Sequence, residues 1–118
     1  MAHKDPSLNR LTVRQLKARR RSLARVVVVD PQAALRGSLV MQERRCGREG
    51  CRCMEGQLHG PYVYLTVARE ESGSRLLYVP AELADAVRER VELSARIEGA
   101  LAEISDINLE LLARRELD

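Results

Sequence analysis

The chain has 118 residues, a net charge of +3, three cysteines, three tyrosines, and neither tryptophan nor phenylalanine. This length suits one small domain, and the missing large aromatics predict a thin, aliphatic core. No apolar run is long enough for a membrane span and no apolar leader segment begins the chain, so we expect a cytoplasmic protein.

Charge is divided unevenly along the chain. Residues 1–52 carry thirteen Lys and Arg against four Asp and Glu, a balance of +9, whereas residues 53–118 carry seven against thirteen, a balance of −6. Two halves of opposite sign indicate either a basic face for nucleic acid or halves that attract each other. We favour the first interpretation.

The N-terminal region predicts a disordered segment over 1–9 and then a basic helical region over 10–37. Apolar residues recur at helical spacing from about Thr12 to Val29, with Thr12 or Asn9 as the N-cap. The run from Val26 to Val29 fits a strand as well as a helix. Asp30 and Pro31 predict one short helical turn from Pro31, closed by Gly37.

Residues 38–80 predict a small sheet. Apolar and polar residues alternate over 38–45 and again over 61–68, and a turn over 70–74 leads from the second segment into residues 75–79 as the other strand of a hairpin. These patterns predict three antiparallel strands. Tyr62 and Tyr64 share one face of the second strand, where they form either an aromatic core wall, which we favour, or a platform for stacking bases.

The loop between the first two strands holds all three cysteines. Cys46, Cys51 and Cys53 are followed by His59, a C-x4-C-x-C-x5-H pattern. Thiolate and imidazole are the ligands that tetrahedral zinc prefers, and four of them leave no open position, so we predict one structural Zn²⁺ per chain. The alternatives are a disulfide with a spare thiol and plain buried cysteines, but the odd count argues against a disulfide framework.

A long helix is predicted over 81–118. Its later part shows four-three spacing through Ile97, Leu101, Ile104, Asn108 and Leu111. This spacing fits a homodimer through the C-terminal helix, and equally a helix that packs on the N-terminal helix of its own chain. The predicted fold is therefore α+β: a single zinc-binding domain over 10–118, in which a three-stranded antiparallel sheet with a zinc-clipped loop is flanked by the basic helix and the long helix.

The residues also resemble a known family. The shared signature combines the cysteine and histidine positions with turn glycines and an aromatic strand: Arg36-Gly37-Ser38-Leu39, Cys46-Gly47, Gly50-Cys51-Arg52-Cys53, Gly56, His59-Gly60-Pro61-Tyr62, Leu65 and Val79-Pro80. It is similar to a small bacterial and phage domain family of unknown function over roughly residues 30–118. Members of that family are often encoded near transposases, and this resemblance implies DNA as a partner in preference to RNA.

The functional prediction is a zinc-binding, nucleic-acid-binding accessory protein that is not an enzyme. We find no catalytic triad, phosphate loop or paired carboxylates, and therefore expect no small-molecule substrate. The alternative is a protein-interaction module that uses the C-terminal helix, with zinc purely structural and the basic helix only a solvated face. The predicted phosphate contacts are basic residues of the helix and of the zinc loop: Arg14, Lys17, Arg19, Arg20, Arg21, Arg25, Arg44, Arg45, Arg48 and Arg52.

Overall fold

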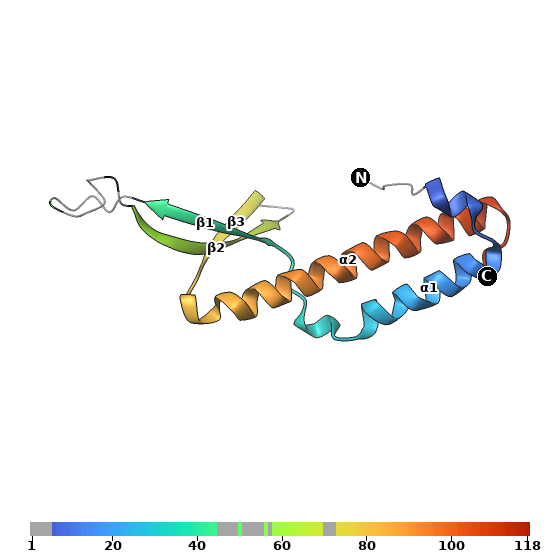
Figure 1. The fold of residues 1–118 in the computed structure, drawn as a ribbon, viewed down its shortest axis with the longest axis horizontal. Coiled ribbons are helices and arrows are strands. Elements are labelled where there is room, and N and C mark those ends of the chain that lie inside the picture. The colour runs from blue at the N-terminus through green and yellow to red at the C-terminus, as the bar shows by residue number, and fades with distance from the viewer. Residues whose placement is uncertain (1–5, 45–49, 51–55, 57, 70–72) are drawn as a thin grey trace. The chain divides into compact units, whose positions relative to one another are not determined.

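The computed structural model describes residues 6–44, 50, 56, 58–69 and 73–118. In chain order the elements are η1 (Pro6–Arg10), α1 (Val13–Val28), η2 (Pro31–Ala33), β1 (Ser38–Arg44), β2 (His59–Arg69), β3 (Gly73–Val79), η4 (Ala81–Leu83) and α2 (Ala84–Ala113) (Figure 1). The predicted α+β class, with a three-stranded antiparallel sheet and two flanking helices, is confirmed.

The chain divides into two compact units. The helical unit contains residues 1–34 and 93–118, and the sheet unit contains residues 35–92. Whether residues 10–118 fold as a single domain stays a prediction.

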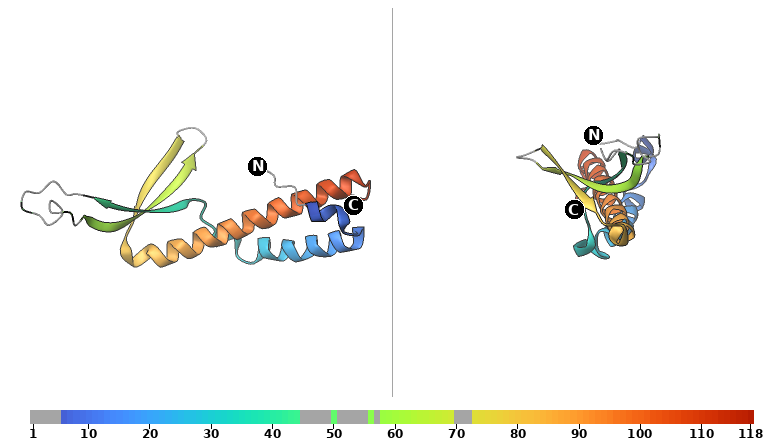
Figure 2. Two further views of the ribbon diagram at one scale, coloured as in Figure 1. Left: turned by 45° about the horizontal axis from the view of Figure 1, so that its top comes forward. Right: turned by 90° about the vertical axis from the view of Figure 1, so that its left-hand side faces the viewer.

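In the helical unit, α1 runs antiparallel beside the C-terminal part of α2 (Figures 1 and 2). Its core contains Leu8, Leu16, Ile107 and Leu111, of which the last three are almost completely inaccessible. Burying such a side chain stabilises the fold by about 1.5–3 kcal/mol. Of the predicted four-three stripe of α2, Leu111 lies in this core and Ile97 is also buried, as expected for a helix that packs on its own chain, whereas Leu101 is half exposed.

The start of α1 follows from its sequence. Thr12 is the N-cap: its Oγ1 accepts a hydrogen bond from the Gln15 amide at 3.1 Å, and the Gln15 side chain accepts one from the Thr12 amide at 2.9 Å. This reciprocal capping box satisfies two amides that would otherwise lack helical partners. The valine run continues the helix to Val28, which resolves its ambiguity in favour of helix.

The expectation of disorder over 1–9 is wrong from Pro6 onward, since η1 is ordered and Leu8 is buried. The reason is Arg114, whose guanidinium donates to the carbonyl oxygens of Leu11, Leu8 and Asn9 at 2.6, 3.1 and 3.3 Å. Residues 1–5 lie outside the described part of the chain.

The long helix is also shorter than predicted. α2 ends at Ala113, after which Arg115 adopts a φ of 59°, and the amides of Arg115 and Glu116 bond back to the carbonyls of Leu112 and Leu111 at 3.0 and 2.8 Å. This is the Schellman arrangement, with Arg115 at the left-handed position that usually holds glycine. The first residues after Pro80 form the 3₁₀ turn η4 rather than α-helix.

The sheet unit has the strand order β1-β2-β3, with β2 in the centre. Its buried residues include Tyr64, Leu65 and Val79. Near the end of β1 the register shifts: Gln42 pairs with Tyr62, but Arg44 pairs with His59, so that Gly60 and Pro61 together face Glu43. This bulge lies next to the predicted zinc loop.

Candidate nucleic-acid and metal sites

The basic residues of α1 fall into two groups. Lys17, Arg19 and Arg20 contact acidic or amide groups at the C-terminal end of the helical unit. An Nη atom of Arg19 lies 2.6 Å from a carboxylate oxygen of Glu103, and Arg20 donates to the Asn108 side chain at 2.7 Å. Some of the positive charge of the N-terminal half is therefore neutralised by acidic residues of the C-terminal half within the helical unit.

Asp118 completes this internal network. Arg20 donates to both of its carboxylate oxygens at 3.0 Å, and the Lys17 ammonium lies 3.7 Å away. The hydrogen bond from Arg20 is the largest cause that lowers the pKa of the Asp118 carboxyl below its ordinary value, followed by a backbone hydrogen bond at Asp118 and, more weakly, by the charges of Arg20 and Lys17.

The second group consists of Arg14, Arg21 and Arg25, which we call the outer arginines. All three are exposed, and none makes an ion pair or hydrogen bond with another described residue. They are 7 and 11 residues apart, which places them within about 40° of one another around the helix axis. Leu16 and Leu23, which pack in the core, point in roughly the opposite direction.

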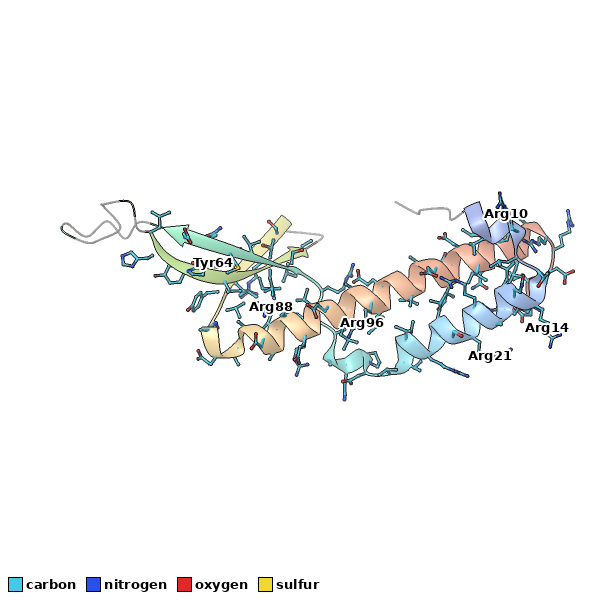
Figure 3. The ribbon with its side chains drawn as sticks, in the orientation of Figure 1. Arg10, Arg14, Arg21, Tyr64, Arg88 and Arg96 are labelled. Carbon is cyan, nitrogen blue, oxygen red and sulfur yellow. The ribbon has the colours of Figure 1, made fainter. Side chains whose placement is uncertain are left out.

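The outer arginines therefore form one basic stripe on the side of α1 turned away from α2, as Arg14 and Arg21 show in Figure 3. The stripe is about 16 Å long at 1.5 Å per residue. A DNA duplex carries a negative charge per about 1.7 Å, so a stripe of this length can meet several phosphates.

The remaining predicted phosphate contacts lie in the zinc loop. Arg45, Arg48 and Arg52 are outside the described residues, and of Arg44 the structure describes only the backbone at the end of β1. Of the ten predicted phosphate contacts, the structure thus places three, Arg14, Arg21 and Arg25, on one exposed surface, where they make no ion pair with another described residue.

Three of the four predicted zinc ligands, Cys46, Cys51 and Cys53, also lie outside the described residues. His59, the fourth, is the first residue of β2 and is half buried. Among the residues that the structure describes, no group of three or more His, Cys, Asp or Glu side chains could hold a metal ion. The zinc site therefore stays a prediction.

Two glycines of this loop that the structure describes have the backbone geometry of turns. Gly50 and Gly56 have φ values of 75° and 106°, a region that glycine reaches without steric penalty. His59 pairs with Arg44, and Cys46 follows Arg44 by two residues. The register of β1 and β2 thus places His59 opposite Arg44, the last residue of β1.

All three tyrosines lie on one face of the sheet. Tyr62 and Tyr64 alternate along β2, and Tyr64 pairs with Tyr78 of β3, their ring centroids 5.8 Å apart in an edge-to-face arrangement. Tyr64 is buried, whereas Tyr78 is 56% exposed. Sequence reasoning considered Tyr62 and Tyr64 and missed Tyr78, although the alternation in β3 and the hairpin register could have indicated it.

A family model described as a domain of unknown function (DUF6788) matches residues 13–89, well over half of the chain, and the protein belongs to this family. The match begins at the first residue of α1, so the basic helix lies inside the family domain rather than mostly outside it, as the resemblance over roughly 30–118 implied. No curated protein and no solved structure shows significant similarity to the chain. None of the described helices is both long and apolar enough to cross a membrane.

Proposed function

We propose that this protein is a small, non-enzymatic, cytoplasmic nucleic-acid-binding accessory protein, in which the outer arginines of α1 contact phosphates. The observation that carries the proposal is the stripe of Arg14, Arg21 and Arg25 opposite the buried face of α1, with no acidic partner among the described residues. Three like charges on one helix face repel each other, which is a cost that a bound polyanion removes.

Phosphate contacts of this kind position a protein on nucleic acid without reading its sequence. We therefore expect similar affinity for unrelated sequences. DNA is favoured over RNA only by the resemblance to a bacterial and phage family that is often encoded near transposases.

A structural zinc ion bound by Cys46, Cys51, Cys53 and His59 completes the proposal. The ion would hold the loop over 45–58 and so place Arg44, Arg45, Arg48 and Arg52 on one small surface. Two observations support this part of the proposal: Gly50 and Gly56 have the positive φ values of turns, and His59 pairs with Arg44 at the end of β1.

The test is a salt titration of binding to a short duplex and to a single strand. The triple variant Arg14→Ala/Arg21→Ala/Arg25→Ala should bind more weakly than the parent. Its slope of log affinity against log salt on duplex DNA should fall by about 0.9 for each phosphate that it no longer neutralises, hence by about 2.7 for three. Its circular dichroism should match that of the parent, because these side chains have no partner among the described residues.

The matched control removes the same charge elsewhere. Arg75, Arg88 and Arg96 are also exposed, and their triple alanine variant should keep the parent slope. If both triple variants lose the same affinity, net charge and not the α1 stripe governs binding, and the proposal is wrong.

A further inference from the structure

Residues 114–118 follow α2 and return to α1. At positions 117 and 118, the hydrogen bonds and ion pairs with other described residues are those of Asp118 with Lys17 and Arg20. The C-terminal end of the chain accordingly lies beside the first turns of α1 (Figures 1 and 2). Because the Asp118 side chain is 54% exposed, this end is held on α1 by a contact that solvent reaches.

Lys17 and Arg20 form an anion site that the Asp118 carboxylate occupies. One Nη atom of Arg20 donates to both carboxylate oxygens at 3.0 Å, and the Lys17 ammonium lies 3.7 Å from one of them. The other Nη atom of Arg20 donates to the Asn108 side chain at 2.7 Å, so a contact separate from Asp118 positions the guanidinium. A guanidinium binds phosphate oxygens by the same hydrogen bonds as carboxylate oxygens. A phosphate in place of Asp118 would therefore meet two cations.

This anion site borders the outer arginines. Lys17 follows Arg14 by three residues and precedes Arg21 by four, the spacings at which side chains are neighbours on a helix surface. Around the helix axis it is about 40° from Arg21 and about 60° from Arg14. A nucleic-acid backbone that lies along the outer arginines would thus reach Lys17, where the carboxylate of Asp118 would repel it.

We propose that Asp118 is an autoinhibitory phosphate mimic, which nucleic acid displaces from Lys17 and Arg20 when it binds the outer arginines. This inference rests on the proposed function and adds Lys17 and Arg20 as phosphate contacts that open on binding. An exposed ion pair changes an equilibrium constant by no more than about fivefold. DNA carries one negative charge per about 1.7 Å, so it can displace a single carboxylate. The contact therefore weakens binding without abolishing it.

The experiment is a salt titration of the full chain against a short DNA duplex. Asp118→Asn should bind about two- to fivefold more tightly than the parent. The matched control is Glu116→Gln, which removes the same charge from the same segment and should bind as the parent does. The Glu116 side chain is exposed and makes no ion pair or hydrogen bond with a described residue. A purely structural role of Asp118 would leave the affinity unchanged or lower it.

A second pair of variants tests the site itself. Lys17→Ala should bind more weakly than the parent, and its slope of log affinity against log salt should fall by about 0.9 for one lost phosphate contact. Asp118→Asn should then gain less affinity in the Lys17→Ala background than in the parent, because the phosphate that replaces the carboxylate has lost one of its two cations. Independent effects would instead add.

The outcomes separate this inference from the proposed function. Unchanged affinity of Asp118→Asn, an equal gain in Glu116→Gln, or a gain that is undiminished in the Lys17→Ala background would overturn the autoinhibitory contact and leave the proposed function intact. Parent affinity in the triple variant of the outer arginines would overturn the proposed function. If neither the parent nor Asp118→Asn binds the duplex, both are wrong.

Discussion

The helical unit and the sheet unit both lack tryptophan and phenylalanine, but different interactions stabilise them. The helical unit has three aliphatic side chains that are almost fully inaccessible, and its segments are joined by contacts such as Arg19 with Glu103 and Arg114 with the Leu8 and Asn9 carbonyls of η1. The sheet unit relies on backbone pairing, with Tyr64, Leu65 and Val79 buried. Its ion pair between Arg88 and Asp85 is local, within one turn of α2.

This difference indicates where each unit is vulnerable. The helical unit should respond to changes in packing and, more weakly, in charge. A three-stranded sheet is near the minimum for independent stability, so the sheet unit should respond most to its backbone geometry and to the proposed metal.

Removal of zinc should have the largest effect, and it should be confined to the sheet unit. Metal analysis should find one zinc per chain, and Cys51→Ser/Cys53→Ser should abolish it. Structural zinc sites contribute on the order of 10 kcal/mol of binding free energy that is coupled to folding, so hydrogen exchange of β1 and β2 should accelerate strongly while α1 stays protected. Stoichiometric zinc in the double variant would rule out the proposed ligand set.

Leu16→Ala should have the next largest effect, in the helical unit. Leu16 is fully buried, and truncating such a leucine costs about 2–5 kcal/mol through reduced burial and the cavity left behind. Val28→Ala is the control on the same helix, because Val28 is 70% exposed and its truncation should change the free energy of unfolding by less than about 0.5 kcal/mol. If urea denaturation showed the same loss in free energy of unfolding for Leu16→Ala and Val28→Ala, Leu16 would not be a central residue of the core.

Gly60→Ala tests the backbone of the sheet unit. A methyl group there would lie 2.9 Å from the carbonyl oxygen of Gln42, and φ at this residue is 120°. We expect a loss of about 1–3 kcal/mol from strain and displacement of β1.

Gly99→Ala is the matched control, since a methyl group at this helical glycine would meet no atom within 4 Å. It should stabilise α2 by about 0.5–1 kcal/mol through reduced freedom of the unfolded chain. A Gly60→Ala variant as stable as the parent would show that the bulge can relax without cost.

Much of the fold could be predicted because its signals are local. The Thr12 cap, the alternation in β1 and β2 and the periodicity of α2 depend on neighbouring residues alone. The bulge at Gly60 could not be predicted, because a shift of one residue in register depends on both strands.

The candidate site was predictable in part. Three consecutive arginines must point in three directions, but which of them meets an acidic partner depends on how α1 lies beside α2. Arg19 and Arg20 are engaged and Arg21 is not, so an Arg19→Ala/Arg20→Ala/Arg21→Ala variant would mix a loss of stability with a loss of binding. The contacts of Arg114 with η1 join residues about a hundred positions apart, so no local sequence pattern could predict them.

The smallest expected effect is the pH dependence of the Asp118 ion pair. Because Arg20 lowers the pKa of this carboxyl in the folded state, its contribution to stability is present above the ordinary value of 3.8 and is lost as the pH falls through the lower, folded value. Asp118→Asn should therefore unfold at a slightly lower denaturant concentration than the parent at pH 7, and the two should converge in acid. Asp85→Asn removes an equal charge from a carboxylate whose side chain is 93% exposed, and should stay close to the parent at pH 7. A gap between parent and Asp118→Asn that persists unchanged into strong acid would show that the side chain stabilises the helical unit by packing and not by its charge.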